Sequence, residues 1–179
     1  MIAPLRAVAP AVLDTMADMP YTAVASIHNE PTEPVPYYER SITLREFSAA
    51  AQDKLVELVG PDSETGLCIA ELRALGGAWD RDPAVPNAVA TRGLPYSLLG
   101  VSAGPLSEER QLKRTVAELL DGMKPWQGAR RFVNNLAPDE AADVAAIYGP
   151  QRYERLASIK KTYDPANMFR LNHNVRPAA

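Results

Sequence analysis

The chain ends in RYERLASIKKTYDPANMFRLNHNVRP, residues 152–177, where a helical pattern meets a fixed stop and an extended tail. Proline is favoured in the first turn of a helix, so the helix is predicted to begin at Pro150. Asp164 precedes Pro165, and a residue before proline is disfavoured in the helical region. The helix is therefore predicted to end at Tyr163, with an asparagine-rich strand after it.

Two further helices are predicted upstream. Thr43 and Glu46 have the spacing of a capping box, which predicts a helix that begins there and ends at Gly60. Ser107, followed by two glutamates, predicts a second helix that ends at Gly122. Their inward faces are expected to carry Leu44, Phe47, Ala51, Leu55 and Leu58 in the first helix and Leu112, Val116, Leu119 and Leu120 in the second.

Four short segments are predicted as strands: residues 20–27, 67–75, 96–103 and 130–136. Helices separate some of them without a regular strand–helix alternation. This order favours an α+β fold, in which an antiparallel β-sheet has helices packed on one face.

Composition excludes several classes of partner. The chain of 179 residues is 46% hydrophobic and 23% charged, with a net charge of −3, so neither nucleic acid nor membrane is expected as a partner. The first 16 residues are interrupted by Arg6, Pro10 and Asp14 and do not read as a signal peptide. Cys68 is the one cysteine and has apolar neighbours, so we expect a buried thiol in a cytoplasmic protein.

Generic motifs of catalysis do not identify a function. His28 and His173 lie far apart, and Asp80 with Asp82 forms a weak pair beside a proline turn, so no metal site is expected. The sequence has neither a nucleophile elbow nor a phosphate-binding glycine loop. On these criteria alone it is an α+β domain without an assigned chemistry.

Residues 148–177, YGPQRYERLASIKKTYDPANMFRLNHNVRP, closely resemble the C-terminal motif of the berberine-bridge-enzyme-like, FAD-linked oxidases. In that family a Tyr-Gly pair leads into a helix Y-x-R-L-x-x-x-K, which ends at Y-D-P-x-N-x-F before an asparagine-containing strand. The matching positions are Tyr153, Arg155, Leu156, Lys160, Tyr163, Asp164, Pro165, Asn167, Phe169, Asn172, Asn174, Val175 and Pro177.

The resemblance extends upstream. ARRFVNNL, residues 129–136, resembles the family's Y-x-N strand, and residues 71–98 resemble a segment of its substrate domain. Residues 4–24 resemble the segment that leads into that domain. The resemblance implies a partial substrate-binding domain at 1–149, followed by a C-terminal helix and flavin-facing tail at 150–179.

The resemblance also implies a cofactor. In the family FAD is held mainly by an N-terminal domain, and nothing in this sequence resembles that domain. We therefore expect a separately encoded FAD-binding polypeptide as a partner, and no FAD bound to the isolated chain. The tail is expected to contact the flavin through Asn172 and Asn174; alternatively, both asparagines satisfy turn backbone.

The resemblance places a phenylalanine at a catalytic position. Many relatives use the tyrosine of Y-x-N as a general base, but this chain has Phe132 there, and a phenyl ring cannot accept a proton. Phe132 either lines a substrate pocket or fills the core. Asn134, Arg92 and Tyr96 are the other candidate pocket residues. Arg92 has a surface ion pair as its alternative, and Tyr96 is the candidate replacement base.

Three hypotheses remain open. The chain is the substrate-binding part of a flavin oxidoreductase, a stand-alone small-molecule-binding module, or a folded remnant that self-associates. A domain normally covered by another exposes apolar area, so we expect the chain to associate with itself or with a partner. The predicted surface carries Trp126, Phe132 and residues 169–175.

Overall fold

The computed structural model describes residues 3–28 and 33–179 and divides the chain into two compact units, Met1–Pro34 and Val35–Ala179. Among its described residues, the first unit contains short helices only: α1 (Ala3–Arg6), a 3-10 turn η1 (Tyr21–Ala23) and α2 (Ala25–His28). The strand predicted at 20–27 is therefore wrong. The amide of Ala23 donates to the carbonyl of Pro20 and closes a helical turn instead of pairing with a strand.

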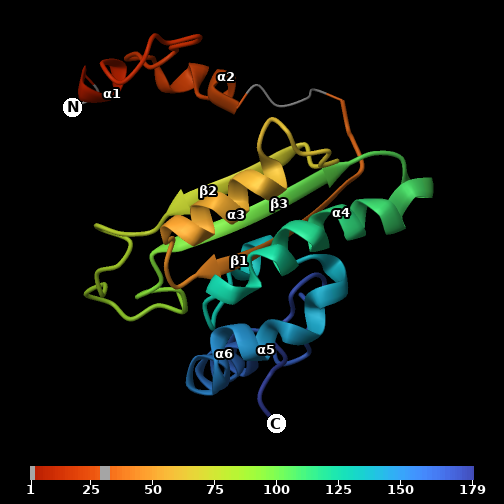
Figure 1. The fold of residues 1–179 in the computed structure, drawn as a ribbon. Coiled ribbons are helices and arrows are strands. Elements are labelled where there is room, and N and C mark those ends of the chain that lie inside the picture. Colours follow the sequence, from red (N-terminus) through yellow and green to blue (C-terminus); the bar gives the residue numbers. More distant parts are fainter. Residues whose placement is uncertain (1–2, 29–32) are drawn as a thin grey trace. The chain divides into compact units, whose positions relative to one another are not determined.

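The second unit is built on a three-stranded antiparallel sheet (Figure 1). Its strands are β1 (Tyr37–Leu44), β2 (Ile69–Ala74) and β3 (Tyr96–Ala103), in the order β1-β3-β2. The central strand β3 pairs with both neighbours, so that Leu99 lies opposite Ser41 on one side and Glu71 on the other. The predicted α+β class is confirmed, as are the strands predicted within 67–75 and at 96–103.

The capping box predicted at Thr43 is wrong, because Thr43 lies in β1. Its backbone is opposite Ser97, and its hydroxyl donates to the carbonyl of Arg130. The helix of this region, α3 (Ala49–Val59), begins after Ser48 and ends before Gly60, as predicted at that end. A β-branched pair, Ile42 and Thr43, favours the extended conformation over the helical one.

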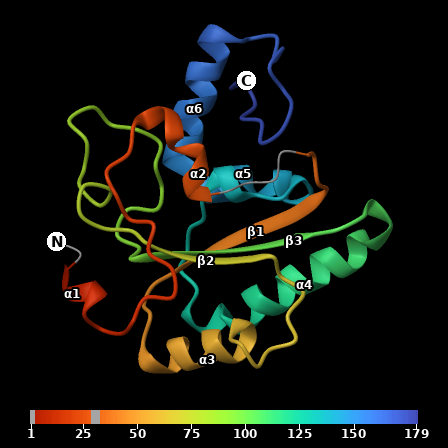
Figure 2. The same cartoon turned by 90° about the horizontal axis from the view of Figure 1, so that it is seen from above.

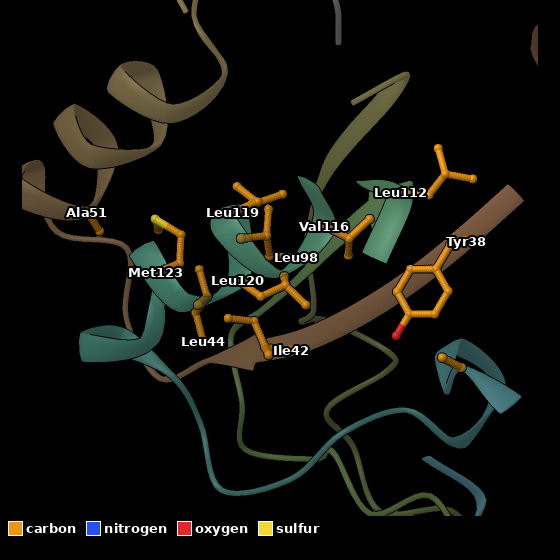
Figure 3. Packing of buried hydrophobic residues seen from close by; sticks show 11 residues of the cluster. Tyr38, Ile42, Leu44, Ala51, Leu98, Leu112, Val116, Leu119, Leu120 and Met123 are labelled. Atoms are coloured by element: carbon orange, nitrogen blue, oxygen red, sulfur yellow. The ribbon is translucent and has the colours of Figure 1, made fainter. Parts of the chain in front are cut away.

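Two helices cover one face of the sheet. Figure 2 shows α3 and α4 (Glu109–Gly122) on the same side of the strands, with the 3-10 turn η2 (Leu106–Glu108) preceding α4. Gly100 of β3 lies so close to α4 that an added Cβ would be 3.0 Å from a methyl group of Leu119. The buried side chains between these elements, shown in Figure 3, are Tyr38, Ile42, Leu44, Ala51, Leu98, Leu112, Val116, Leu119, Leu120, Met123 and Ala137.

A second, smaller cluster lies under the C-terminal helices. It is formed by α5 (Val144–Tyr148) and α6 (Pro150–Tyr163), on the other side of the sheet from α3 and α4 (Figure 2). Leu136, Val144 and Ile147 are its buried members, and Val175 of the tail packs against them. The bounds of α6 agree with those predicted from Pro150 and Asp164-Pro165.

The segment 124–143 joins the two clusters by short 3-10 turns: η3 (Lys124–Trp126), η4 (Val133–Asn135) and η5 (Pro138–Asp143). The strand predicted at 130–136 is therefore wrong. Residues 130–136 form no ladder with a strand. The hydroxyl of Thr43 donates to the carbonyl of Arg130, so a side chain satisfies part of the backbone of this segment. Trp126, at the end of η3, packs partly buried against the main core.

The thiol predicted to be buried is not. Cys68 is exposed just before β2, and its Sγ lies 3.2 Å from the carbonyl oxygen of Val101. The apolar residues around it lie on alternating faces of the extended chain, so they do not enclose the thiol.

A buried carboxylate fixes the segment after β3 against β1. Glu140 is 7% exposed, and one of its oxygens accepts hydrogen bonds from Arg40 and Arg131, each at 2.5 Å. Its other oxygen accepts the amide of Ala137 at 3.0 Å. Arg131 also donates to the carbonyl of Ser41 in β1. These contacts hold residues 131–137 beside the edge of the sheet.

Replacement of Glu140 by Gln is predicted to lower the free energy of unfolding by about 3 kcal/mol, because two partly buried guanidinium groups then face a neutral amide. Burial by itself would raise the pKa of Glu140, but the hydrogen bonds from Arg131 and Arg40 outweigh it and the pKa lies below its usual value. Because the pKa of Glu140 is lower in the folded state, its carboxylate stabilises the protein above about pH 4. The protein loses this stabilisation as the pH falls further and Glu140 is protonated.

Urea unfolding between pH 3 and 7 measures both effects. Between pH 7 and pH 3, the unfolding free energy of the Glu140→Gln variant is expected to fall less than that of the unchanged protein, because the variant has no carboxylate at this position to protonate. Glu118→Gln, an exposed replacement on α4, serves as the control and should change the unfolding free energy by less than about 0.5 kcal/mol. Equal effects of the two variants would contradict the assigned role.

Candidate functional site

The sheet has one face that no helix of the main core covers. Side chains alternate along a strand, and Leu98 and Gly100 of β3 face the helices. Ser97 and Leu99 therefore face the other way, as do their ladder neighbours on β2, Glu71 and Arg73. We call this side the open face.

Two hollows lie beside the open face. The smaller, of about 40 Å³, lies over Glu71, Ser97 and Leu99 and is bounded by Phe132 and Asn135. The larger, of about 460 Å³, lies between residues 88–91, residues 131–135 and the end of α5. We call the larger one the aromatic hollow. Phe132 and Arg73 line both hollows, so the two hollows are neighbours that share part of their lining.

Aromatic rings form one wall of the aromatic hollow. The rings of Trp79 and Phe132 have centroids 5.5 Å apart and are tilted by 52°, an arrangement typical of favourable aromatic pairs. Tyr148, at the end of α5, lines the same hollow, and burial raises the pKa of its phenol. At neutral pH Tyr148 therefore keeps its proton and acts as a hydrogen-bond donor.

Polar groups reach the hollow from three directions. Thr91 is 1% exposed, and its hydroxyl has no hydrogen-bond partner among the residues described. Buried hydroxyls are normally paired, so this one is available to a ligand or a water molecule. Asn134 is exposed at the rim, and Arg73 projects from β2 with its guanidinium paired to Glu71 at 2.6 Å.

Of the predicted pocket residues, the structure brings Phe132 and Asn134 together. Tyr96 lies elsewhere: it shares the helix-covered face with Leu98, and its ring centroid is 5.6 Å from that of Phe47. The parity of β3 separates the phenol of Tyr96 from Phe132, because the two lie on opposite faces of the sheet.

Arg92 also lies outside the aromatic hollow. Its Nε donates to the carbonyl of Arg81 at 3.1 Å, and one terminal nitrogen donates to the side chain of Asn87 at 3.0 Å. The structure therefore shows Arg92 bound to uncharged acceptors of the loop of residues 81–89, and not to a carboxylate of the described chain.

Sequence reasoning missed Trp79, Thr91 and Tyr148. Trp79 follows Gly76-Gly77, and the positive φ of 57° at Gly77 marks the turn that directs the chain toward the hollow. A tryptophan directly after a glycine pair was the available signal. Tyr148 belongs to the Tyr-Gly pair of the C-terminal motif, but its place in the hollow depends on the path of α5.

The tail contains no strand, which corrects the prediction for residues 169–177. Asn172 has a positive φ of 60°, and its carbonyl accepts the amide of Asn174, as in a tight turn. Nε2 of His173 lies 3.0 Å from the carbonyl oxygen of Leu136. The side-chain oxygen of Asn174 is buried without a partner within the described chain, whereas Asn172 is exposed.

An ion pair fixes the start of the tail. Nζ of Lys160 lies 2.5 Å from Asp164 and donates to the carbonyl of Phe169 at 2.6 Å. Asp164 also accepts the amides of Met168 and Phe169, at 2.7 and 3.0 Å. The hydrogen bond from Lys160, the largest cause, and these two amides lower the pKa of Asp164.

This ordered turn leaves Met168, Phe169 and Leu171 exposed, at 70%, 78% and 85%. We call these three residues the apolar tail surface.

Within 3–28 and 33–179, no three His, Cys, Asp or Glu side chains are grouped so that they could hold a metal ion. In the described part of the chain, no helix is long and apolar enough to cross a membrane.

Comparison with known proteins agrees with the C-terminal motif. Residues 131–176 match the protein family described as "Berberine and berberine like". The (R)-6-hydroxynicotine oxidase of Paenarthrobacter nicotinovorans is 47% identical over 46 residues, which are 26% of this chain and 10% of that protein. An FAD-linked oxidoreductase of Pyricularia oryzae is 41% identical over 70 residues, 36% of this chain and 13% of that protein.

The fold extends the similarity beyond the motif. A crystal structure of 6-hydroxy-D-nicotine oxidase from Arthrobacter nicotinovorans superposes on 99% of this chain and 41% of its own, with a TM-score of 0.68 and 23% identity. The chain therefore spans less than half the length of the relatives that it matches. The resemblance to the C-terminal portion of these oxidases is confirmed by the family match and the fold together.

Replacement of Phe132 by Tyr is predicted to change the free energy of unfolding by less than about 0.5 kcal/mol, because the added hydroxyl can reach the open hollow. Phe47→Tyr is the matched control, since Phe47 packs against the main core. An unpaired hydroxyl there costs about 1–3 kcal/mol. Thermal or urea unfolding measures both; a loss at Phe132 as large as that at Phe47 would assign Phe132 to the core.

Proposed function

We propose that this chain, whose C-terminal quarter is a berberine-like segment, is the substrate-binding, flavin-contacting portion of an FAD-linked oxidoreductase. Its partner in this proposal is a separately encoded FAD-binding polypeptide. The observation that carries the proposal is the juxtaposition of the family's C-terminal segment with an aromatic hollow beside the open face of the sheet.

When bound, the flavin would accept a hydride from the substrate. The residues of this chain hold and orient that substrate. Trp79 and Phe132 present rings suited to stack on a planar or ring-bearing molecule, and Thr91, whose buried hydroxyl has no partner among the described residues, also lines the hollow. Asn134 at the rim and the protonated phenol of Tyr148 supply further hydrogen bonds.

The chain lines this hollow without an evident general base. Phe132 cannot take a proton, and the raised pKa of Tyr148 makes its phenol a donor at neutral pH. Tyr96, the candidate base from sequence, packs on the helix-covered face. We therefore propose that the FAD-binding polypeptide supplies the proton acceptor, or that the substrate reacts without one.

The tail supports a partner at the flavin side. The apolar tail surface is held outward by the contacts of Lys160 and Asp164, and an ordered apolar surface of this kind is typical of an interface. Asn172 and Asn174 lie directly beyond it. In this proposal both asparagines approach the flavin when the partner covers the tail. Association of two copies through the same surface is the alternative.

A second candidate function is a stand-alone small-molecule-binding module. The observation that favours it is that Trp79, Phe132 and Tyr148 already form an aromatic lining of the hollow. A ring-bearing ligand would then bind without redox chemistry. Binding of such ligands by the isolated chain, with no gain on addition of an FAD-binding polypeptide, would favour this function over the first.

The isolated chain is predicted to bind FAD more weakly than micromolar. The tail offers a few hydrogen bonds of about 1 kcal/mol each, whereas micromolar affinity needs roughly −8 kcal/mol. The purified chain is incubated with FAD and then dialysed against buffer, and its absorbance spectrum shows whether flavin remains bound. A flavin spectrum that survives dialysis would contradict the need for a partner.

Replacement of both Phe169 and Leu171 by Ser is predicted to weaken association with the FAD-binding polypeptide at least about tenfold, because two exposed apolar side chains leave the interface. Val56→Ser is the control, since Val56 is 63% exposed on α3. Light scattering and calorimetry with the co-expressed polypeptide measure the effect. Unchanged association of the tail variant, or a loss equal to that of Val56→Ser, would move the interface elsewhere.

A further inference from the structure

A second and larger cavity lies beside α6. It has a volume of about 680 Å³ and opens between the loop of residues 82–92 and the first three turns of α6. It adjoins the aromatic hollow only through Ala88, which lines both. The charged residues that line it are Asp82, Arg92, Arg152 and Arg155. We call it the arginine groove.

One cation of the groove is held in place without being neutralised. Arg92 donates to the carbonyls of Arg81 and Val89 and to the side-chain oxygen of Asn87, all at 3.0–3.3 Å. These acceptors are uncharged. The guanidinium is therefore fixed in position while its full positive charge remains available, which lowers the conformational cost of binding an anion.

Two more cations come from α6. Arg152 and Arg155 line the groove, and neither forms an ion pair with any residue that the structure describes. Gln151 and Arg152 also belong to the first turn of α6, whose amides have no acceptor within the helix. Asp82 is the one carboxylate among the lining residues, so three cations face one anion.

The charge of the groove contrasts with that of the whole protein. The chain carries a net charge of −3, and several of its other arginines and lysines pair with carboxylates, as Lys113 does with Glu109. The groove also has apolar walls, formed by Pro83, Pro86, Leu156 and Ile159. Unpaired guanidinium groups beside apolar walls suit a ligand that has an anionic group on an apolar body.

We propose that the arginine groove is a binding site for a small organic anion, an aromatic carboxylate or phosphate, separate from the substrate hollow. Its anionic group lies between Arg92 and the arginines of α6, and its apolar body lies on the prolines and Leu156. Because the site consists of residues of this chain alone, it binds in the isolated chain and does not depend on flavin or on the proposed oxidoreductase activity.

The test uses the full chain and a matched pair of probes, 2-naphthoate and its neutral amide, 2-naphthamide. Calorimetry measures affinity, and the ¹⁵N–¹H resonances of the arginine side chains report which guanidinium groups respond. We expect saturable binding of naphthoate, shifts of the Arg92 and Arg155 resonances, and at least about tenfold weaker binding of naphthamide. Naphthyl phosphate should bind more tightly than naphthoate and weaken more steeply with salt.

Arg155→Gln is expected to weaken naphthoate binding about tenfold, because it removes one charge-assisted contact. Arg110→Gln is the matched control, since Arg110 is an exposed arginine of α4 that lies outside the groove. Circular dichroism checks that both variants are folded. Because α6 continues on both sides of Arg155 and its side chain is exposed, the Gln variant is expected to fold normally.

Several results would overturn the proposal. They are no saturable binding of naphthoate or naphthyl phosphate, equal binding of naphthamide, or equal losses in Arg155→Gln and Arg110→Gln. Release of bound naphthoate on addition of the FAD-binding polypeptide, with the arginine resonances shifted by that polypeptide instead, would make the groove a protein interface and also overturn it. Only this last outcome involves the FAD-binding polypeptide; the others leave the proposed oxidoreductase function untouched.

Discussion

The packing of α4 on the central strand β3 is the constraint on which the rest of the second unit depends. Leu98 of β3 is fully buried against α4. Gly100 has no side chain, and Leu119 of α4 packs into the space that a Cβ at this position would occupy. Strand side chains alternate, so burial of this face directs Ser97 and Leu99 to the other. A register shift of one residue in β3 would exchange the two faces and remove the open face together with the hollows beside it.

The cluster of Glu140 with Arg40 and Arg131 connects the sheet to the segment that lines the site. Arg131 bonds both Glu140 and the carbonyl of Ser41, which ties the residue before Phe132 to β1. The ring of Phe132 is thereby placed over the open face and against Trp79. A buried carboxylate with two arginines adds little net stability compared with apolar packing, but it fixes one geometry. Here the geometry is that of the aromatic wall.

How far the sequence predicts this structure depends on whether local signals agree with packing. The bounds of α6 follow from Pro150 and Asp164-Pro165, because proline acts on its own neighbours. Thr43 satisfied the pattern of a capping box, yet sheet pairing with Ser97 determines its conformation. Residues 130–136 have strand-like composition and run beside the edge strand β1, but they form no ladder with it: the side chain of Thr43 binds the backbone of Arg130, and the side chain of Arg131 binds the backbone of Ser41.

The site was predicted only in part, for the same reason. Phe132 and Asn134 come from one motif and lie at one hollow, whereas Trp79, Thr91 and Tyr148 reach it through turns that the sequence pattern does not encode. A strand at 130–136 beside β3 would bring Tyr96 next to Phe132, but residues 130–136 form no strand. The two-residue period of β3, set by Leu98 and Gly100, places Tyr96 on the helix-covered face.

Amide hydrogen exchange on the chain, alone and with a flavin-loaded FAD-binding polypeptide, tests most directly whether the open face and the tail meet a flavin unit. The account predicts slower exchange in residues 69–74, 131–135 and 168–174 when the partner is added. It predicts no change in α3 and α4, which cover the opposite face of the sheet. Protection confined to α3 and α4, or no protection anywhere, would contradict it.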